Sequence, residues 1–351
     1  DLDQKLDQFL NSVIPQIDYS KIKQSPNTAT RGASSTVLAV YAEKIENMIV
    51  ASADLSNSDK TDGFLKKTTA FQKGDFSGAF FQAGVSELSM AVIMNGMALH
   101  GGVIPVCGTF FVFSDYMKPA VRMAALMELP VKYVWTHDAF RVGEDGPTHQ
   151  PVEQEAQIRL MEKLKNHSGV NSMLVLRPAD GLETSTAWKT ALENTNSPSA
   201  LILSRQNIKD IPAKGDRFEE ALQISKGAYI VKDSDGTPDV VLLASGSEVA
   251  TLVGASEIIG KEDVKVRILS VPSEGLFRSQ SKEYQQKLLP KGIKRFGLTS
   301  GLSVTLEGLV GDNGAVWGLN SFGYSAPYTV LDEKLGFTPE QVSKQIMKLI
   351  K

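Results

Sequence analysis

The chain has 351 residues, enough for two or three domains that each bury a core of their own. Its formal net charge of −3, with 42% hydrophobic and 22% charged residues, is that of an ordinary globular protein and leaves no basic footprint for a nucleic acid or an anionic membrane surface. No apolar run reaches the roughly 18 residues of a membrane helix, and the single cysteine, Cys107, excludes an internal disulfide and fits a reducing compartment such as the cytoplasm.

The first segment, residues 1–24, carries apolar side chains at helical spacing before Pro15. It predicts an amphipathic helix that docks on another surface, or a linker from a preceding domain. The sequence starts at Asp1 and not at methionine, so we expect trimming, truncation or a larger precursor. Further along, residues 47–53 predict a buried strand that ends at Asp54, ahead of a serine-rich loop.

A long apolar stretch, residues 84–102 (GVSELSMAVIMNGMALHGG), predicts a helix that is buried on nearly all sides. Near its start stands one carboxylate, Glu87. A favourable interaction with the helix dipole would explain this residue, and so would a partly buried acid that relays protons. The segment TFFVFSDY then brings Phe110, Phe113 and Tyr116 close together. Such aromatic side chains usually belong to a core, but they also form stacking walls for flat heterocycles.

The most polar motif lies at residues 134–150 (VWTHDAFRVGEDGPTHQ), between a predicted strand and a helix expected to have Pro151 at its first position. In open α/β sheets, ligands bind at this end of the strands. Asp145 can accept hydrogen bonds from hydroxyl groups, and His137 and His149 can exchange protons near neutral pH. A polar surface loop with incidental histidines explains the local composition about equally well.

Short apolar strands alternate with helices along the rest of the chain, which predicts parallel α/β sheets. The alternation pauses in a polar segment, residues 207–219, and restarts at residue 240. We therefore predict an α/β fold of two consecutive domains, each with a mainly parallel sheet flanked by helices. The expected divisions are a linker or amphipathic helix at residues 1–24 and domains at residues 25–212 and 213–351.

Seven segments together resemble the transketolase family, in that family's order and at its approximate spacing. They are TATR (28–31), SADLSNS (52–58), GVSELSM (84–90), LHGG (99–102), TFFVFSDY (109–116), THDAFRVGEDGPTHQP (136–151) and LSRQN (203–207). The run GEDGPTHQPVEQ is highly specific. The resemblance covers nearly the whole chain, but only the later part of a transketolase. It implies a pyrimidine-binding domain followed by the transketolase C-terminal domain.

The resemblance implies transfer of a two-carbon ketol unit between ketose and aldose phosphates through thiamine diphosphate, as in the pentose phosphate pathway. Glu87 would bond the aminopyrimidine nitrogen, which favours the imino tautomer that removes the thiazolium C2 proton. This role requires a protonated, desolvated carboxylic acid. Phe110 would stack on the pyrimidine, Phe113 and Tyr116 would complete its pocket, and Asp54 would approach the cofactor.

For the sugar phosphates, the resemblance implies a phosphate-binding set whose guanidinium groups suit phosphate oxygens. The set consists of Arg31, Ser58, His137 and Arg205. Asp145 matches the residue that reads the C2 hydroxyl group. His149 matches the histidine beside the donor carbonyl, where it stabilises charge or relays protons during carbon–carbon cleavage.

The family's earlier domain, which holds the diphosphate through Mg²⁺ and a GDG…N motif, has no counterpart in this sequence. We therefore expect no metal site in this chain, no turnover by the isolated chain, and a homodimeric assembly that includes the missing domain. Two alternatives remain at this stage: the beta subunit of a 2-oxo acid dehydrogenase, and a non-catalytic fragment that only assembles or dimerises.

Overall fold

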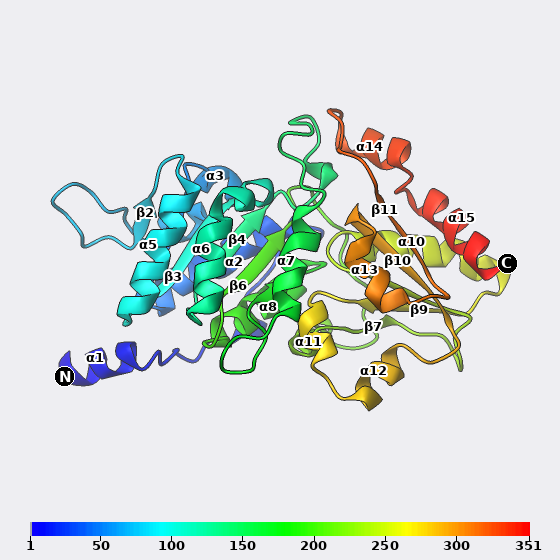
Figure 1. Ribbon diagram of the computed structural model, residues 1–351, viewed down its shortest axis with the longest axis horizontal. Coiled ribbons are helices and arrows are strands. Elements are labelled where there is room, and N and C mark those ends of the chain that lie inside the picture. Colours follow the sequence, from blue (N-terminus) through cyan, green and yellow to red (C-terminus); the bar gives the residue numbers. More distant parts are fainter. Residues whose placement is uncertain (1) are drawn as a thin grey trace.

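Two α/β units lie side by side in the computed structural model, which describes residues 2–351 (Figure 1). The first unit is built on a six-stranded sheet of order β2-β1-β3-β4-β6-β5, in which every neighbouring pair is parallel. Its strands are β1 (Met48–Ser52), β2 (Phe80–Gln82), β3 (Ile104–Phe110), β4 (Lys132–Thr136), β5 (Leu174–Leu176) and β6 (Ser199–Leu203). The predicted parallel sheet is confirmed. The sequence does not predict β2, because three residues are too few to show a pattern.

Helices cover both faces of this first sheet. One face carries α2 (Thr30–Lys44) and α8 (Gly181–Glu193), and the other carries α5 (Glu87–His100), α6 (Ser114–Leu126) and α7 (Gln154–Lys163). Successive strand residues point to opposite faces, so Val106 enters the core with α2 and Cys107 enters the core with α5 and α6. Strands that are buried on both faces appear in the sequence as continuous apolar runs, as these do.

The second unit is a five-stranded sheet of order β11-β10-β8-β9-β7, parallel except for β7, which pairs antiparallel with β9. The strands are β7 (Tyr229–Lys232), β8 (Val240–Ala244), β9 (Val266–Ser270), β10 (Lys294–Leu302) and β11 (Ala315–Leu319). On one face lie α10 (Glu248–Ile259), α14 (Tyr328–Leu335) and α15 (Pro339–Ile350), and on the other α11 (Glu274–Arg278), α12 (Lys282–Leu288) and α13 (Val304–Val310). The predicted mainly parallel sheet is confirmed, and the division at residue 212 stays a prediction.

Shorter elements occupy the connections. They are α1 (Leu2–Leu10), α3 (Ser56–Asp59), α4 (Asp62–Leu65), α9 (Arg217–Ala221) and 3₁₀ turns at Tyr19–Lys21, Phe111–Phe113, Phe140–Val142, Leu222–Lys226 and Gly260–Glu262. The amphipathic helix expected at the start is present as α1. It lies at one end of the first unit, where Lys5 pairs with Glu46, and its apolar residues Leu2, Leu6 and Leu10 are exposed (Figure 1).

Two details of the predicted helices are wrong. α7 begins at Gln154, so Pro151 precedes the helix and is not its first residue. The apolar helix α5 is buried on one side only: Met90, Ala91 and Met94 face the core, whereas a stripe on its other side that includes Leu88 and Val92 is exposed. The prediction of complete burial assumed that one copy of the chain covers the whole helix. No helix among residues 2–351 is long and apolar enough to cross a membrane.

A buried chain of ion pairs joins the two units. Arg177, directly after β5, bonds to Asp138 of its own domain and to Glu248 in the first turn of α10. The other oxygen of Glu248 pairs with Arg141, which also bonds to Asp332 of α14. Burial works to raise the pKa of Glu248, but the two arginines more than offset it and leave that pKa lowered. Each buried charge in this part of the contact between the domains therefore has a partner of opposite sign.

Candidate active site

Predicted site residues follow the carboxyl ends of the strands in the first sheet. Across the sheet from its β2 edge, Glu87 comes after β2, Asp54 after β1, Phe110 ends β3, His137 follows β4 and Arg205 follows β6. Because these strands are all parallel, their carboxyl ends share one edge, which is where ligands bind in such folds. The topology therefore brings together residues that are far apart in the sequence.

Arg31, in the first turn of α2, connects two other members of the predicted phosphate-binding set. Its Nη1 donates to the backbone oxygen of Ser58 at 2.7 Å and lies 3.4 Å from Nε2 of His137. Burial, and then the nearby charge of Arg205, lower the pKa of Arg31. Arg205 itself makes no hydrogen bond or ion pair with the described residues. Two guanidinium groups that repel each other, one of them unpaired, form a site suited to a phosphate.

His137 is buried and adopts an uncommon left-handed backbone conformation, with φ of 63°. Because a guanidinium can only donate, Nε2 of the ring accepts from Arg31, which leaves the proton on Nδ1, 2.9 Å from Oγ1 of Thr136. Burial, and then Arg31 and Arg205, lower the pKa of His137 to about 2. In this setting the ring is neutral and serves as a hydrogen-bonding group, and proton exchange by His137 near neutral pH stays a prediction.

Aromatic rings form a ladder beside His137. Phe110 stacks on the imidazole with ring centroids 3.6 Å apart, Phe113 stacks on Phe110 at 5.8 Å, and Tyr116 stacks on Phe113 at 5.9 Å. His149 meets the edges of Phe110 and Phe113 at 6.3 and 5.5 Å. Phe110 is buried and Tyr116 is 61% exposed, so the ladder runs from the core out to the surface. This exposure favours a stacking wall over a purely structural cluster.

Glu87 is the first residue of α5 and is 8% exposed. Its carboxylate makes no hydrogen bond or ion pair with the described residues, so its oxygens are free to bond to a ligand. Asp54, at the end of the neighbouring β1, is exposed and has a φ of 63°. An unpaired carboxyl group at the same sheet edge as an aromatic ladder suits a flat nitrogen heterocycle.

The loop that carries Asp145 is held by the second domain. Gly143 and Gly146 have φ of 89° and 76°, which gives the tight turns that the sequence predicts. Oγ of Ser325 donates to the backbone oxygen of Glu144 at 2.6 Å, and this loop lies beside the segment leading into α14 (Figure 1). Asp145 is exposed and makes no hydrogen bond within residues 2–351, so the structure does not join it to the phosphate-binding set.

Sequence reasoning missed Asp59, which anchors the segment that carries Ser58. The buried carboxylate accepts hydrogen bonds from the Ser52 hydroxyl and from the backbone and hydroxyl of Thr61, and burial raises its pKa to about 6. The spacing Asp59-Lys-Thr61 is that of a side chain bonding to the backbone two residues on, so turn chemistry could have found it. Within residues 2–351, no three His, Cys, Asp or Glu side chains are placed to share a metal ion.

Comparison with known proteins assigns both units. Residues 27–210 match the family model of the transketolase pyrimidine binding domain, and residues 227–338 match the transketolase-like TK C-terminal domain. The chain belongs to the transketolase family. A curated Bacillus subtilis transketolase is 44% identical over 93% of the chain and 48% of its own length. The chain thus spans about half the length of the curated transketolases it matches.

Solved structures of the family show the same arrangement. A transketolase from Leishmania mexicana is 36% identical, with a TM-score of 0.89 over 99% of this chain and 49% of its own. A Pichia stipitis transketolase in complex with sedoheptulose 7-phosphate is 34% identical, with a TM-score of 0.88 over 99% of this chain and 50% of its own. A chain described as a split gene transketolase, inactive beta4 tetramer, covers 92% of this chain and 98% of its own (TM-score 0.70, 23% identity), which shows the fold alone.

Proposed function

We propose that this chain forms the pyrimidine-binding and sugar-phosphate-binding part of a transketolase that transfers a two-carbon ketol unit between ketose and aldose phosphates. The observation that carries the proposal is one sheet edge with three features. These are the unpaired Glu87, the ladder from Phe110 outward, and the unpaired Arg205 close to Arg31. The family assignment favours this function over a 2-oxo acid dehydrogenase subunit.

The cofactor proposed for this edge is thiamine diphosphate. Its aminopyrimidine ring fits the unpaired carboxyl group of Glu87 and the stacking face of Phe110, with Phe113, Tyr116 and Asp54 around it. When bound, the cofactor supplies a nucleophilic carbon and an electron sink. Glu87 holds a proton against a pyrimidine nitrogen, and the aromatic ladder orients the ring and excludes water from one face.

The substrate's phosphate end is assigned to Arg31, Arg205, His137 and Ser58. The neutral His137 ring accepts a hydrogen bond from Arg31 and so holds that guanidinium in place without adding charge, while the guanidinium groups provide the attraction. The proposed role of Asp145 is to read the C2 hydroxyl group of the sugar, and that of His149 is to relay a proton near the donor carbonyl. His149 touches the aromatic ladder, as this role requires.

The proposed working form is an assembly. We propose that two copies cover the apolar face of α5 and that a diphosphate-binding domain with Mg²⁺, on a longer form of this chain or on a second polypeptide, completes each site. Intact mass of the protein from its native source, with any polypeptide that copurifies, identifies that form. A single species of this chain alone, without a partner, would overturn the requirement for another domain if it turned over sugar phosphates.

The catalytic proposal is tested in the assembled enzyme with Glu87→Gln. We expect exchange of the cofactor's C2 proton, followed by NMR, to fall by at least about 100-fold, because the amide cannot supply the acidic proton. The matched control is Glu43→Gln, an exposed glutamate paired with Lys67 on the outer surface of α2. Near-normal exchange in Glu87→Gln would refute the role of Glu87, and loss of exchange in both variants would indicate a general structural defect.

A further inference from the structure

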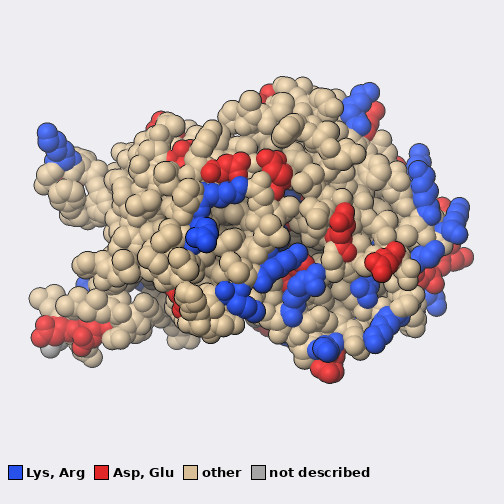
Figure 2. Space-filling view, viewed as in Figure 1, with Lys and Arg blue, Asp and Glu red and all other residues tan. Residues whose placement is uncertain are grey.

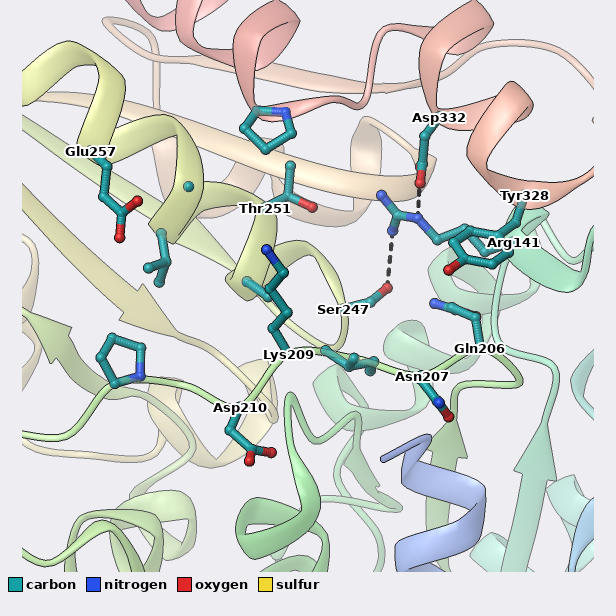
Figure 3. Close-up of a pocket in the computed structure, with 16 residues that line it drawn as sticks. Arg141, Gln206, Asn207, Lys209, Asp210, Ser247, Thr251, Glu257, Tyr328 and Asp332 are labelled. Atoms are coloured by element: carbon teal, nitrogen blue, oxygen red, sulfur yellow. Dashed lines mark hydrogen bonds and ion pairs between the residues drawn. The ribbon is translucent and has the colours of Figure 1, made fainter. Parts of the chain in front are cut away.

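A cleft of about 490 Å³ lies between the two domains, outside the site described above (Figure 3). Its first wall is the segment of residues 206–212, which leaves the first sheet after Arg205. The opposite wall is formed by α10, with α14 and the first residue of α15 closing the end. A volume in the range of about 300–1,000 Å³ is typical of small-molecule sites.

One buried side chain in this cleft has no partner. Gln206 is 6% exposed, and neither its amide nitrogen nor its amide oxygen makes a hydrogen bond with the described residues. Figure 3 shows its amide end pointing into the cleft. A buried carboxamide with both atoms unsatisfied is rare in folded proteins, because water or a partner normally fills both positions. A bound group with one acceptor and one donor side by side would satisfy it.

The charged side chains that line the cleft differ in whether they have hydrogen-bond or ion-pair partners. Arg141 donates to Asp332 through Nε and to Ser247 and Glu248 through Nη1, so its charge is balanced by two carboxylates. Lys209 makes no ion pair or hydrogen bond with residues 2–351, and its side chain extends across the cleft toward Thr251 in Figure 3. Lys209 is therefore the one cation of the cleft without a partner among residues 2–351, and the carboxylates of Asp210 and Glu257 also line the cleft.

Apolar side chains and one aromatic ring make up another part of the lining. Tyr328 presents a half-exposed ring near one end, and Ile208, Ala250, Val253 and Pro339 line the floor and sides. A ring that enters beside Gln206 could stack on Tyr328 while the rest of the ligand lies on the apolar surface.

We propose that this cleft binds a nucleoside monophosphate or a closely similar molecule, with a flat nitrogen heterocycle joined to one anionic group. The heterocycle's adjacent donor and acceptor pair with the carboxamide of Gln206, as a glutamine pairs with the N6 and N7 positions of adenine. The phosphate lies on Lys209. Gln206 directly follows Arg205, so a ligand bonded to Gln206 lies next to a member of the proposed phosphate-binding set. The inference does not depend on the proposed function.

The test is calorimetric titration of the 351-residue chain with AMP, GMP, UMP and CMP. Ribose 5-phosphate is titrated in parallel, because a nucleotide whose phosphate sits between Arg31 and Arg205 would compete with it. We expect at least one mononucleotide to bind in the presence of saturating ribose 5-phosphate. Gln206→Leu should weaken that binding at least about tenfold, since it removes both hydrogen bonds of a bidentate pair.

Two further variants make the result independent of folding defects. Ala250→Phe fills the cleft from α10 and should also abolish binding, whereas Lys214→Ala, an exposed lysine just outside the cleft, should leave binding unchanged. Circular dichroism checks that each variant is folded. Absence of binding by all four nucleotides at millimolar concentration would overturn the proposal. So would binding that ribose 5-phosphate displaces, or binding that persists in both Gln206→Leu and Ala250→Phe.

Discussion

The contact between the two domains and the face over α5 are built in opposite ways. Between the domains, Arg177, Glu248 and Arg141 are buried and bonded to one another or to further carboxylates. Over α5, apolar side chains such as Val92 are exposed, few charged side chains are seen (Figure 2), and the nearby Glu87 has no partner. The first region is complete within one copy of the chain.

This difference separates a contact whose buried charges are paired within one chain from a surface that is suited to binding another protein. An exposed apolar face with few charges is typical of a protein–protein interface. The proposed site lies at the border of that face, so the unsatisfied Glu87 and the exposed end of the aromatic ladder belong to a surface that a partner would cover. The following four predictions test the contrast.

Removing the cation at the centre of the domain contact should have the largest effect. Arg177→Met leaves Asp138 buried without its cation and Glu248 with Arg141 alone, and we expect the free energy of unfolding to drop by about 3–5 kcal/mol. Urea denaturation followed by tryptophan fluorescence measures it. Arg122→Met, at an exposed arginine of α6, is the matched control and should change stability by no more than about 0.5 kcal/mol. Equal losses in the two variants would contradict the central role of Arg177.

A charge on the α5 face should weaken self-association without unfolding the chain. For Val92→Glu we expect the dissociation constant, measured by analytical ultracentrifugation, to rise at least about 100-fold, because the carboxylate would lose its hydration in the interface. Val304→Glu on α13 is a close control, since Val304 is 52% exposed and Val92 is 53% exposed. An interface on the second domain would be indicated if Val304→Glu were the more damaging variant.

Asp59 should make stability depend on pH. Its pKa is about 6 in the folded chain and near the ordinary 3.8 when unfolded, so the folded state holds the proton more tightly and the free energy of unfolding falls as pH rises from 4 to 6. Asp59→Asn should reduce that fall by about 2 kcal/mol. Ser52→Ala removes a hydrogen bond that lowers this pKa and should shift the window upward. Identical pH profiles for the wild type and Asp59→Asn would rule out this source.

The smallest effect is expected at Glu87. Because its carboxylate bonds to nothing in residues 2–351, Glu87→Gln should change the stability of the isolated chain by no more than about 0.5 kcal/mol. The same substitution at Glu183 should cost about 2 kcal/mol, since that buried carboxylate accepts hydrogen bonds from Tyr229, Ser270 and the backbone of Ala179. Thermal and chemical denaturation of both variants compare them directly. A similar cost at the two positions would mean that Glu87 has a structural partner after all.

Much of the architecture could be predicted from the sequence, because strands that are buried on both faces are continuous apolar runs, and these runs alternate with helices. Strand β1 lies within the predicted range of residues 47–53 and β8 begins at residue 240 as predicted, whereas the three-residue β2 leaves no pattern. The sequence cannot show that α5 is covered on one side only, since a helix apolar on all sides looks the same whether the chain or a partner covers it.

Part of the candidate site could also be predicted from the sequence. The resemblance supplied the residue set, and the order of parallel strands explains why Glu87, Phe110 and His137 share an edge. Their electrostatic state could not be predicted from the sequence, because the lowered pKa of His137 arises from burial and from two arginines that are distant in the sequence. The Arg177 to Glu248 pair was missed for a similar reason, since each partner alone is an ordinary charge near a strand or helix end.

The position of Cys107 has a practical consequence. The only thiol of the chain lies in the middle of β3, fully buried, where burial raises its pKa far above the ordinary value. Such a thiol is unreactive toward alkylating probes. A single cysteine introduced at an exposed position, such as Phe322→Cys, would therefore take up a spin label or fluorophore selectively. Distances between labels on two copies could then map the assembly without first removing the native residue.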